Sequence, residues 1–101
     1  MGSDQKLQSK LEELIGNRNV YYQPPASNQM SYPCIRYSKR RIEHDYANNS
    51  KYRRKNCYEI IVIDRLPDND VINKLLELPY CSYDRHYTAD NLNHDVLTLY
   101  F

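Results

Sequence analysis

Residues 81–101 hold the side-chain types that most readily do chemistry. They include one thiol, two imidazoles and three aspartates (Cys81, His86, His94, Asp84, Asp90 and Asp95). Thiolate, imidazole and carboxylate groups are the usual protein ligands of zinc, and histidine and aspartate are common general acids and bases. Their spacing decides whether they form a metal site, a catalytic site or only a hairpin with a polar turn.

The spacing argues against a metal centre. Zinc sites usually present their ligands in close pairs, such as C-x2-C or H-x3-H, and this segment has no such pair. An odd number of positions separates Cys81 from His86, so on a regular strand their side chains point to opposite faces of the sheet. Only a bulge between them would change this. We therefore expect no metal.

Catalytic patterns are equally scarce. The chain has no G-x-S-x-G, P-loop or G-x-G-x-x-G motif, and its two glycines are too few for a phosphate-binding loop. A nuclease needs carboxylates that converge on a divalent cation, but Asp64 ends a predicted strand and Asp90 lies in a predicted turn. We expect neither an enzyme nor a cofactor.

The remaining interpretation of this segment is a β-hairpin. Residues 80–87 and 95–101 have strand-like composition, and the link between them is rich in Asn and Asp, which favour turns. Asp90, Asn91 and Asn93 are expected to form the turn. Asp84 and Arg85 are expected to project on alternate sides of the strand, where they can pair with charges on a neighbour.

Length and charge limit the remaining possibilities. The 101 residues are enough for one domain, residues 1–101, which buries roughly two thirds of its unfolded surface. With 14 basic and 13 acidic residues, no global field attracts a polyanion. No membrane span or secretory signal is expected, because long apolar runs are absent. The three dispersed cysteines predict reduced thiols in a protein made in the cytosol.

Tyrosine is unusually abundant, with 11 residues against one phenylalanine and no tryptophan. Tyrosine combines a large contact area with a polar tip and is favoured at interfaces. The codon usage of an AT-rich genome would enrich tyrosine as well. The sequence leaves both explanations open.

The N-terminal third predicts one helix and a connector. Apolar residues at helical spacing (Leu7, Leu11, Leu14 and Ile15) predict a helix over residues 4–15 that Gly16 ends. Its opposite face is polar. Residues 17–33 contain three prolines and are expected to connect elements. Within them, residues 20–22 are expected either to form a short strand or to lie along a surface.

The rest of the chain predicts an α+β fold. Residues 34–42 begin a strand, and residues 57–64 are apolar on both faces, which is typical of a central strand. A second helix is expected over residues 68–78, with Asp68 as its cap. We predict a mostly antiparallel sheet of about four strands, with two helices packed on one face and a long projecting hairpin over residues 38–56.

The predicted hairpin carries half of the basic residues of the chain, with two tyrosines among them. Three interpretations stay open: contact with nucleic acid through phosphates and stacked bases, a solvated tip whose charges prevent aggregation, and an arm that contacts a neighbour in an oligomer or lines a channel for DNA. The candidate contact residues are Lys39, Arg40, Arg41, Tyr46, Lys51, Tyr52, Arg53 and Arg54.

Several segments together resemble a family of phage proteins. They are Tyr32-Pro33-Cys34-Ile35, the stretch from Asp64 through Pro67-Asp68, the pair Asp84-Arg85, and residues 87–94. This pattern, over about residues 19–101, resembles small virion proteins from the morphogenesis modules of tailed phages and prophages of Gram-positive bacteria. The order of elements is similar to that of lambda-type tail terminators, although this chain is shorter than many of them.

The resemblance implies a structural role without catalytic residues. The first expectation is a tail terminator or tail completion protein that forms a ring, expected to be hexameric, at the head-proximal end of the tail tube. Its partners would be copies of itself, the major tail tube protein and the head–tail connector or neck proteins, with DNA passing through the ring. It would assemble in the host cytoplasm and reside in the virion. The alternatives are a head-completion or stopper protein of the neck, and a small nucleic-acid-binding module.

Overall fold

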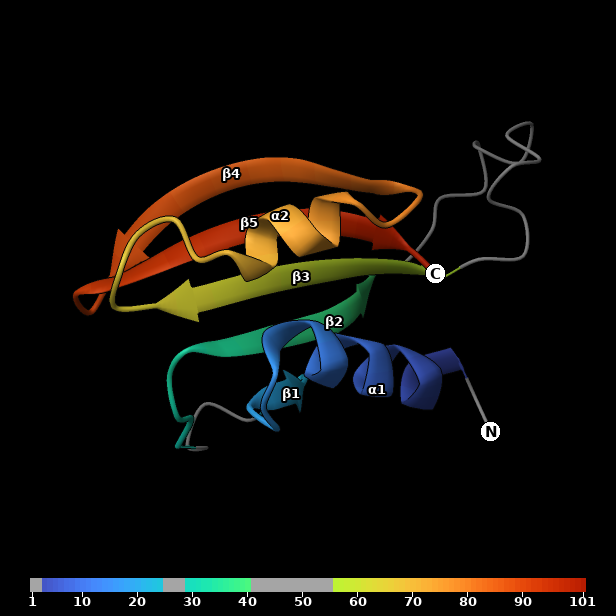
Figure 1. Cartoon of the computed structure of the whole chain (residues 1–101), viewed down its shortest axis with the longest axis horizontal. Helices are drawn as coiled ribbons and strands as arrows, with labels where there is room; N and C mark the ends of the chain where they lie inside the picture. The colour runs from blue at the N-terminus through green and yellow to red at the C-terminus, as the bar shows by residue number, and fades with distance from the viewer. Residues whose placement is uncertain (1–2, 25–28, 41–55) are drawn as a thin grey trace.

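The structure is a computed structural model that describes residues 3–24, 29–40 and 56–101. The strands in these residues form one sheet in the order β1-β2-β3-β5-β4, and both helices lie on the same face of it (Figure 1). The expected α+β class is confirmed. The elements are α1 (Ser3–Ile15), β1 (Val20–Tyr22), β2 (Cys34–Arg40), β3 (Cys57–Asp64), α2 (Val71–Leu76), β4 (Cys81–Ala89) and β5 (Leu92–Tyr100).

Strand β1 makes the sheet mixed and five-stranded, where about four mostly antiparallel strands were predicted. It lies inside the predicted connector, residues 17–33, and pairs parallel to β2 with Val20 opposite Ile35. The side chain of Asn19 donates to the carbonyl of Pro33 at 3.3 Å, which ties the start of β1 to the start of β2. Of the two possibilities for residues 20–22, the strand is therefore the one adopted.

Helix α1 follows its apolar periodicity. Leu7 and Leu11 are fully buried against the sheet, and Gly16 ends the helix with φ +80°. Gln8, expected on the polar face, instead joins the helix to the sheet. Its amide accepts a hydrogen bond from the Tyr37 hydroxyl at 2.7 Å and donates one to the Val20 carbonyl at 3.0 Å.

Substitutions of Gly16 test whether its left-handed backbone is what ends helix α1. A Cβ at this position would meet no atom within 4 Å, so the cost of Gly16→Ala comes from its left-handed backbone alone. We expect a loss of about 1–2 kcal/mol in the free energy of unfolding, because left-handed geometry costs this much for an ordinary L residue. Urea unfolding measures it. Gly16→Asn is the control and should lose less, since asparagine tolerates this conformation; equal losses would contradict the explanation.

Strand β3 is the centre of the sheet, with the bounds that its apolar run predicted. It pairs antiparallel with β2 on one side and with β5 on the other. Residues 60–63 are buried on both faces. The β2–β3 ladder continues as far as Arg40 opposite Cys57, so the first residues of the predicted projecting hairpin belong to the sheet. Residues 41–55, the rest of that hairpin, lie outside the described residues.

Helix α2 is shorter than the predicted 68–78, and Asp68 does not cap it. Asp68 has φ +59° and lies in the connector before the helix. The local hydrogen bond comes from Asn69 instead, whose side-chain oxygen accepts from the backbone N–H of Val71 at 2.8 Å. The side-chain nitrogen of Asn69, Nδ2, donates to the Asp64 carboxylate at 2.6 Å. The connector from β3 to α2 is therefore held by its asparagine and by the last residue of β3.

Two apolar clusters pack on the two faces of the sheet. The larger lies between the sheet and both helices and includes Tyr37 and Tyr58, whose rings are 6.1 Å apart. Part of the tyrosine content thus fills the core, a use that neither explanation from the sequence considered. The smaller cluster lies on the opposite face, which we call the outer face. It consists of Cys34, Ile61, Ile63 and Val96, with Tyr21, Met30, Tyr32 and Leu92 packed against it.

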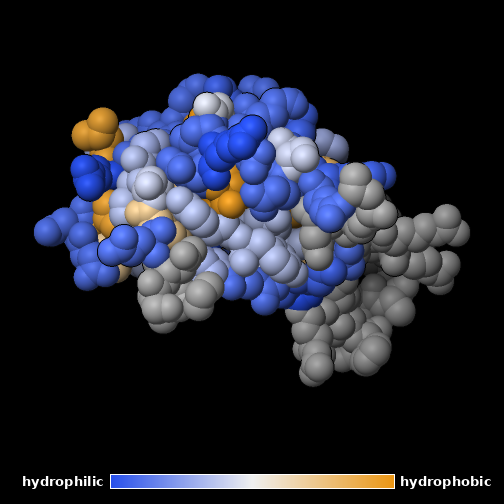
Figure 2. Space-filling model, turned by 90° about the horizontal axis from the view of Figure 1, so that it is seen from below, coloured by the Kyte–Doolittle hydropathy of each residue, from blue (hydrophilic) through white to orange (hydrophobic). Residues whose placement is uncertain are grey.

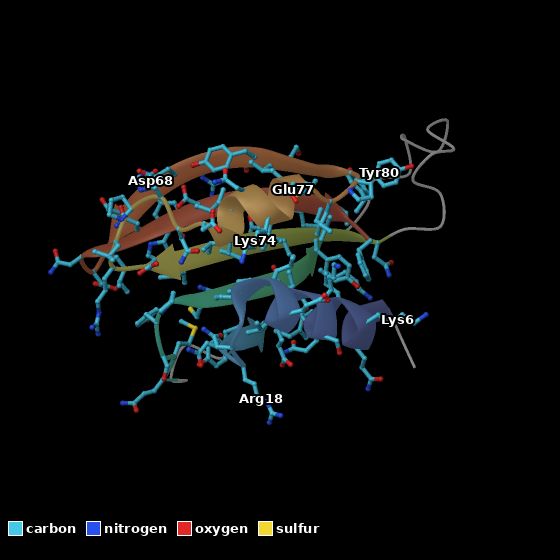
Figure 3. All side chains as sticks on the ribbon, in the orientation of Figure 1. Lys6, Arg18, Asp68, Lys74, Glu77 and Tyr80 are labelled. Atoms are coloured by element: carbon cyan, nitrogen blue, oxygen red, sulfur yellow. The ribbon has the colours of Figure 1, made fainter. Side chains whose placement is uncertain are left out.

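The surface beside α1 and β1 is predominantly hydrophilic, with only scattered hydrophobic residues (Figure 2). Lys6 and Arg18 point away from the sheet on this side, as Figure 3 shows. Among the described residues, no helix is long and apolar enough to cross a membrane.

Candidate functional site

The segment with the reactive side chains is a β-hairpin. Strands β4 and β5 are joined by Asp90 and Asn91, both with positive φ (53° and 61°), as a two-residue type I′ turn requires. Asn93 was predicted in the turn but belongs to β5. Its side chain donates to the carbonyl of Arg65 at 3.2 Å and so fastens the hairpin to the connector after β3.

A β-bulge at Asp84 changes which face each side chain occupies. The register shifts between Tyr83, opposite Leu97, and Arg85, opposite Val96. Because of this shift, Cys81 lies opposite Leu99 and His86 lies opposite Asp95, two β5 residues whose side chains share one face of the sheet. The side chains of Cys81 and His86 are therefore on the same face, and the prediction of opposite faces was wrong. They still lie roughly 15 Å apart along the strand, too far to share a metal. The bulge also explains why the adjacent residues Asp84 and Arg85 form an ion pair at 2.8 Å, where alternate sides were predicted.

The other reactive groups are also separate. His94 lies on the outer face, where its ring stacks on that of Tyr87 with centroids 4.6 Å apart. Asp68 and Asp70, a D-x-D pair, are exposed in the connector before α2, and Asp70 lies 3.9 Å from Lys74. Across residues 3–24, 29–40 and 56–101, no three His, Cys, Asp or Glu side chains come together as a metal site.

The thiols of Cys34 and Cys81 have raised pKa values. Burial is the main cause at both of these positions, and it raises the pKa of Cys34 to about 12 and that of Cys81 to about 11. A thiol is nucleophilic only as the thiolate. At neutral pH both groups are therefore protonated and act as apolar side chains rather than as nucleophiles.

Asp95 is a buried carboxylate with one clear role. It accepts a hydrogen bond from the Tyr83 hydroxyl at 2.6 Å, a cross-strand contact between β5 and β4. This hydrogen bond, with smaller contributions from burial and from the carboxylate charge, raises the pKa of Tyr83 from 10.0 to about 12. The geometry orients the phenol and satisfies the carboxylate.

The Tyr83–Asp95 contact predicts a loss of stability in alkali. The folded protein holds the Tyr83 proton more tightly than the unfolded chain, so the stabilisation is complete below pH 10 and disappears as the pH rises through about 12. Urea unfolding from pH 9 to 12 measures this loss. Tyr83→Phe should lose less stability over the same pH range than the wild type. Tyr87→Phe, the control on the same strand, should lose as much stability as the wild type. Identical pH profiles for the wild type and Tyr83→Phe would contradict the assignment.

Two of the eight predicted contact residues lie in the described part of the chain, and they do not form one basic patch. Arg40 is on the outer face, where its Nη2 lies 3.1 Å from Glu59 Oε2 and Nη1 lies 3.4 Å from Thr98 Oγ1. Lys39 is on the helix face, with Nζ 6.0 Å from the centroid of the Tyr58 ring. The Arg40 guanidinium is therefore already paired with a carboxylate. The other six, Arg41, Tyr46, Lys51, Tyr52, Arg53 and Arg54, lie outside the described residues.

The edge formed by β4 is the feature that the sequence analysis missed. Eight of its nine residues are exposed, including Tyr83 and Tyr87 with 45% and 37% of their surfaces accessible. No described strand lies beyond it in the sheet, as the upper edge in Figure 1 shows. Exposed aromatic residues on an unpaired strand are typical of a surface that contacts another chain.

The pairing pattern identifies which backbone groups of β4 point away from β5. Tyr100 N–H donates to the Tyr80 carbonyl at 3.1 Å, so Tyr80 and Tyr100 form a hydrogen-bonded pair. Such pairs alternate along an antiparallel ladder, so before the bulge the backbone N–H and C=O groups of Cys81 and Tyr83 point away from β5. We call such residues outward-facing. After the bulge, the type I′ turn makes Ala89 and Leu92 a hydrogen-bonded pair. By alternation His86 and Thr88 then face outward.

The opposite edge of the sheet is far less accessible to a new strand. Strand β1 has only three residues, and the outward carbonyl of Val20 is already occupied by the Gln8 side chain of α1. Of the two sheet edges in the described residues, β4 is therefore the one that offers a long row of backbone donors and acceptors.

No family model, curated protein or solved structure matches this chain. A functional assignment therefore depends on the surface itself. A β4 edge that is long, exposed and rich in tyrosine is suited to binding another protein chain through backbone hydrogen bonds, with the side chains selecting the partner.

Proposed function

We propose that this protein is a structural subunit of a tailed-phage virion that acts as the tail terminator. Copies of the chain would form a ring, taken as a hexamer, on the head-proximal end of the tail tube. The partners would be the major tail tube protein on one side and the head–tail connector or neck proteins on the other, with DNA passing through the ring. The subunit would assemble in the host cytoplasm and remain in the virion.

The observation that supports this proposal most is the exposed β4 edge of an α+β domain. A protein that functions by assembly needs surfaces complementary to other subunits, and β4 supplies one with tyrosines on both faces of the strand. The resemblance of the sequence to small phage virion proteins is the second support, and the proposed place at the head-proximal end of the tail rests on that resemblance alone.

Deleting the gene from a phage or prophage that carries it tests the proposal. Loss of a terminator leaves tails of uncontrolled length, because nothing stops the addition of tube subunits. Loss of a stopper protein leaves tails of normal length and heads that leak DNA, and this outcome would move the protein to the connector side of the neck. Virions that form normally without the protein would reject both positions.

A binding assay with purified components gives an independent test. The protein should bind one end of purified tail tubes, visible by negative-stain electron microscopy, and should block further polymerisation of tube subunits. Protein that neither binds tubes nor slows their growth would contradict the terminator assignment. Bovine serum albumin at equal concentration controls for non-specific adhesion.

A further inference from the structure

The bulge in β4 changes the spacing along the strand of the residues whose backbone groups point away from β5. On a regular strand every second residue faces outward, but here the spacing is two, three and two positions along Cys81, Tyr83, His86 and Thr88. A regular strand laid against this edge can match the groups on one side of the bulge only. It is then out of phase on the other side. The edge therefore discriminates against ordinary strands.

We propose that β4 pairs antiparallel with β4 of a second copy of this chain, around a two-fold axis that passes between Asp84 and Arg85. The four outward-facing residues are placed symmetrically about that point. Reversing the strand puts Tyr83 opposite His86 of the second copy and Cys81 opposite Thr88 of the second copy. Each of the four residues then lies opposite an outward-facing residue of the second copy. This holds on both sides of the bulge, because the three-position gap between Tyr83 and His86 in one strand lies opposite the same gap in the other.

The charges at the centre of this arrangement are complementary. In the proposed register Asp84 lies opposite Arg85 of the second copy, and the two-fold axis repeats the contact. Opposite charges directly across a strand pair stabilise the pairing, and like charges destabilise it. Within one copy, Asp84 Oδ2 already lies 2.8 Å from Arg85 Nη1, so the pairing assembles four charges of alternating sign around the axis.

The composition of β4 is compatible with this partner. Edge strands that avoid pairing usually carry lysine or proline, are very short, or are covered by another element. Strand β4 spans nine residues and contains neither lysine nor proline. Among the described residues no strand covers this edge, and the bulge is the feature that opposes pairing with an ordinary strand. A second copy is the partner against which the bulge has no effect. The pairing extends the sheet through both molecules with the helices on the same side.

This inference does not depend on the proposed function. The contact is isologous and closes on itself. It uses the same β4 edge that supports self-assembly in the proposed function, so a ring built from such dimers needs a second, head-to-tail contact on another surface. Tail tubes capped by a protein without the β4 contact would support the terminator role alone, and a β4-paired dimer that ignores tail tubes would support the inference alone.

Amide hydrogen exchange locates the contact. Sedimentation velocity should show a concentration-dependent dimer of the full chain. At high concentration the amides of Tyr83, His86 and Thr88 should exchange at least about tenfold more slowly than at low concentration, since pairing protects them from solvent. The amide of Val20, whose carbonyl the Gln8 side chain occupies at the far edge, is the control. A chain that stays monomeric up to about 1 mM, the weak end of the affinity scale, would overturn the inference, as would a dimer with unprotected β4 amides.

A charge reversal tests the register. Asp84→Arg places only positive charges around the axis and should raise the dissociation constant of the dimer at least about tenfold. The double variant Asp84→Arg/Arg85→Asp restores alternating charges and should recover dimer formation to near the wild-type level. Both variants should melt close to the wild type, because these side chains are exposed. A double variant that stays as weak as the single one, with its melting temperature unchanged, would show that the register is wrong.

Discussion

Ile60→Ala is expected to lose about 2–5 kcal/mol in the free energy of unfolding, the range for truncating a large buried aliphatic residue. Ile60 is fully buried and lies in the ladder between Tyr37 of β2 and Leu97 of β5. The cavity would open in the cluster that joins the sheet to both helices. For a small domain this is a large share of a total stability of about 5–15 kcal/mol.

Leu66→Ala is the matched control for Ile60→Ala. Leu66 is also a large aliphatic residue, but 71% of its surface is accessible, so its truncation should change stability by no more than about 0.5 kcal/mol. Chemical denaturation of both variants beside the wild type measures the difference. Losses of similar size would mean that the cluster between the sheet and the helices is not the core of the protein.

The elements that the sequence predicted best are those with a strong apolar pattern. Strand β3 and helix α1 match their expected ranges to within a residue. Burial on both faces leaves a continuous apolar run, and one buried helix face leaves an apolar stripe at helical spacing, so both elements can be recognised in the sequence. Helix α2 was predicted too long. The positive φ of Asp68 and the hydrogen bond from Asn69 set where it begins, and neither has a periodic signature.

The features that matter most for the candidate site depend on pairing between distant segments. A bulge adds one residue to a strand without changing its composition, so nothing in the sequence around Asp84 marks it. The parallel pairing of β1 with β2 joins segments on the two sides of the connector, through backbone hydrogen bonds and the contact of Asn19 with Pro33. Positive charge is concentrated in residues 38–56, and this made that segment the predicted contact site. The exposed β4 edge carries little net charge, so charge does not mark it in the sequence.

Two proline substitutions in β4 test which of its backbone N–H groups bond to β5 and which point away from it. Tyr87→Pro should lose about 2–4 kcal/mol, because its N–H faces β5 and its ring stacks on His94. Thr88→Pro should lose about 1 kcal/mol or less, since its N–H faces away from β5 and proline is tolerated at such positions of an edge strand. Urea unfolding at low protein concentration measures both without a contribution from association.

The comparison with side-chain truncations separates the backbone effect from the loss of contacts. Tyr87→Ala removes the stacked ring and keeps the N–H, so it should be less destabilising than Tyr87→Pro by the value of one ladder hydrogen bond, about 1 kcal/mol or more. Thr88→Ala should match Thr88→Pro closely. If Thr88→Pro were the more damaging proline, the ladder would have the opposite phase after the bulge. His86 and Thr88 would then face β5, and the β4 edge would lose the symmetry that makes a second copy its best partner.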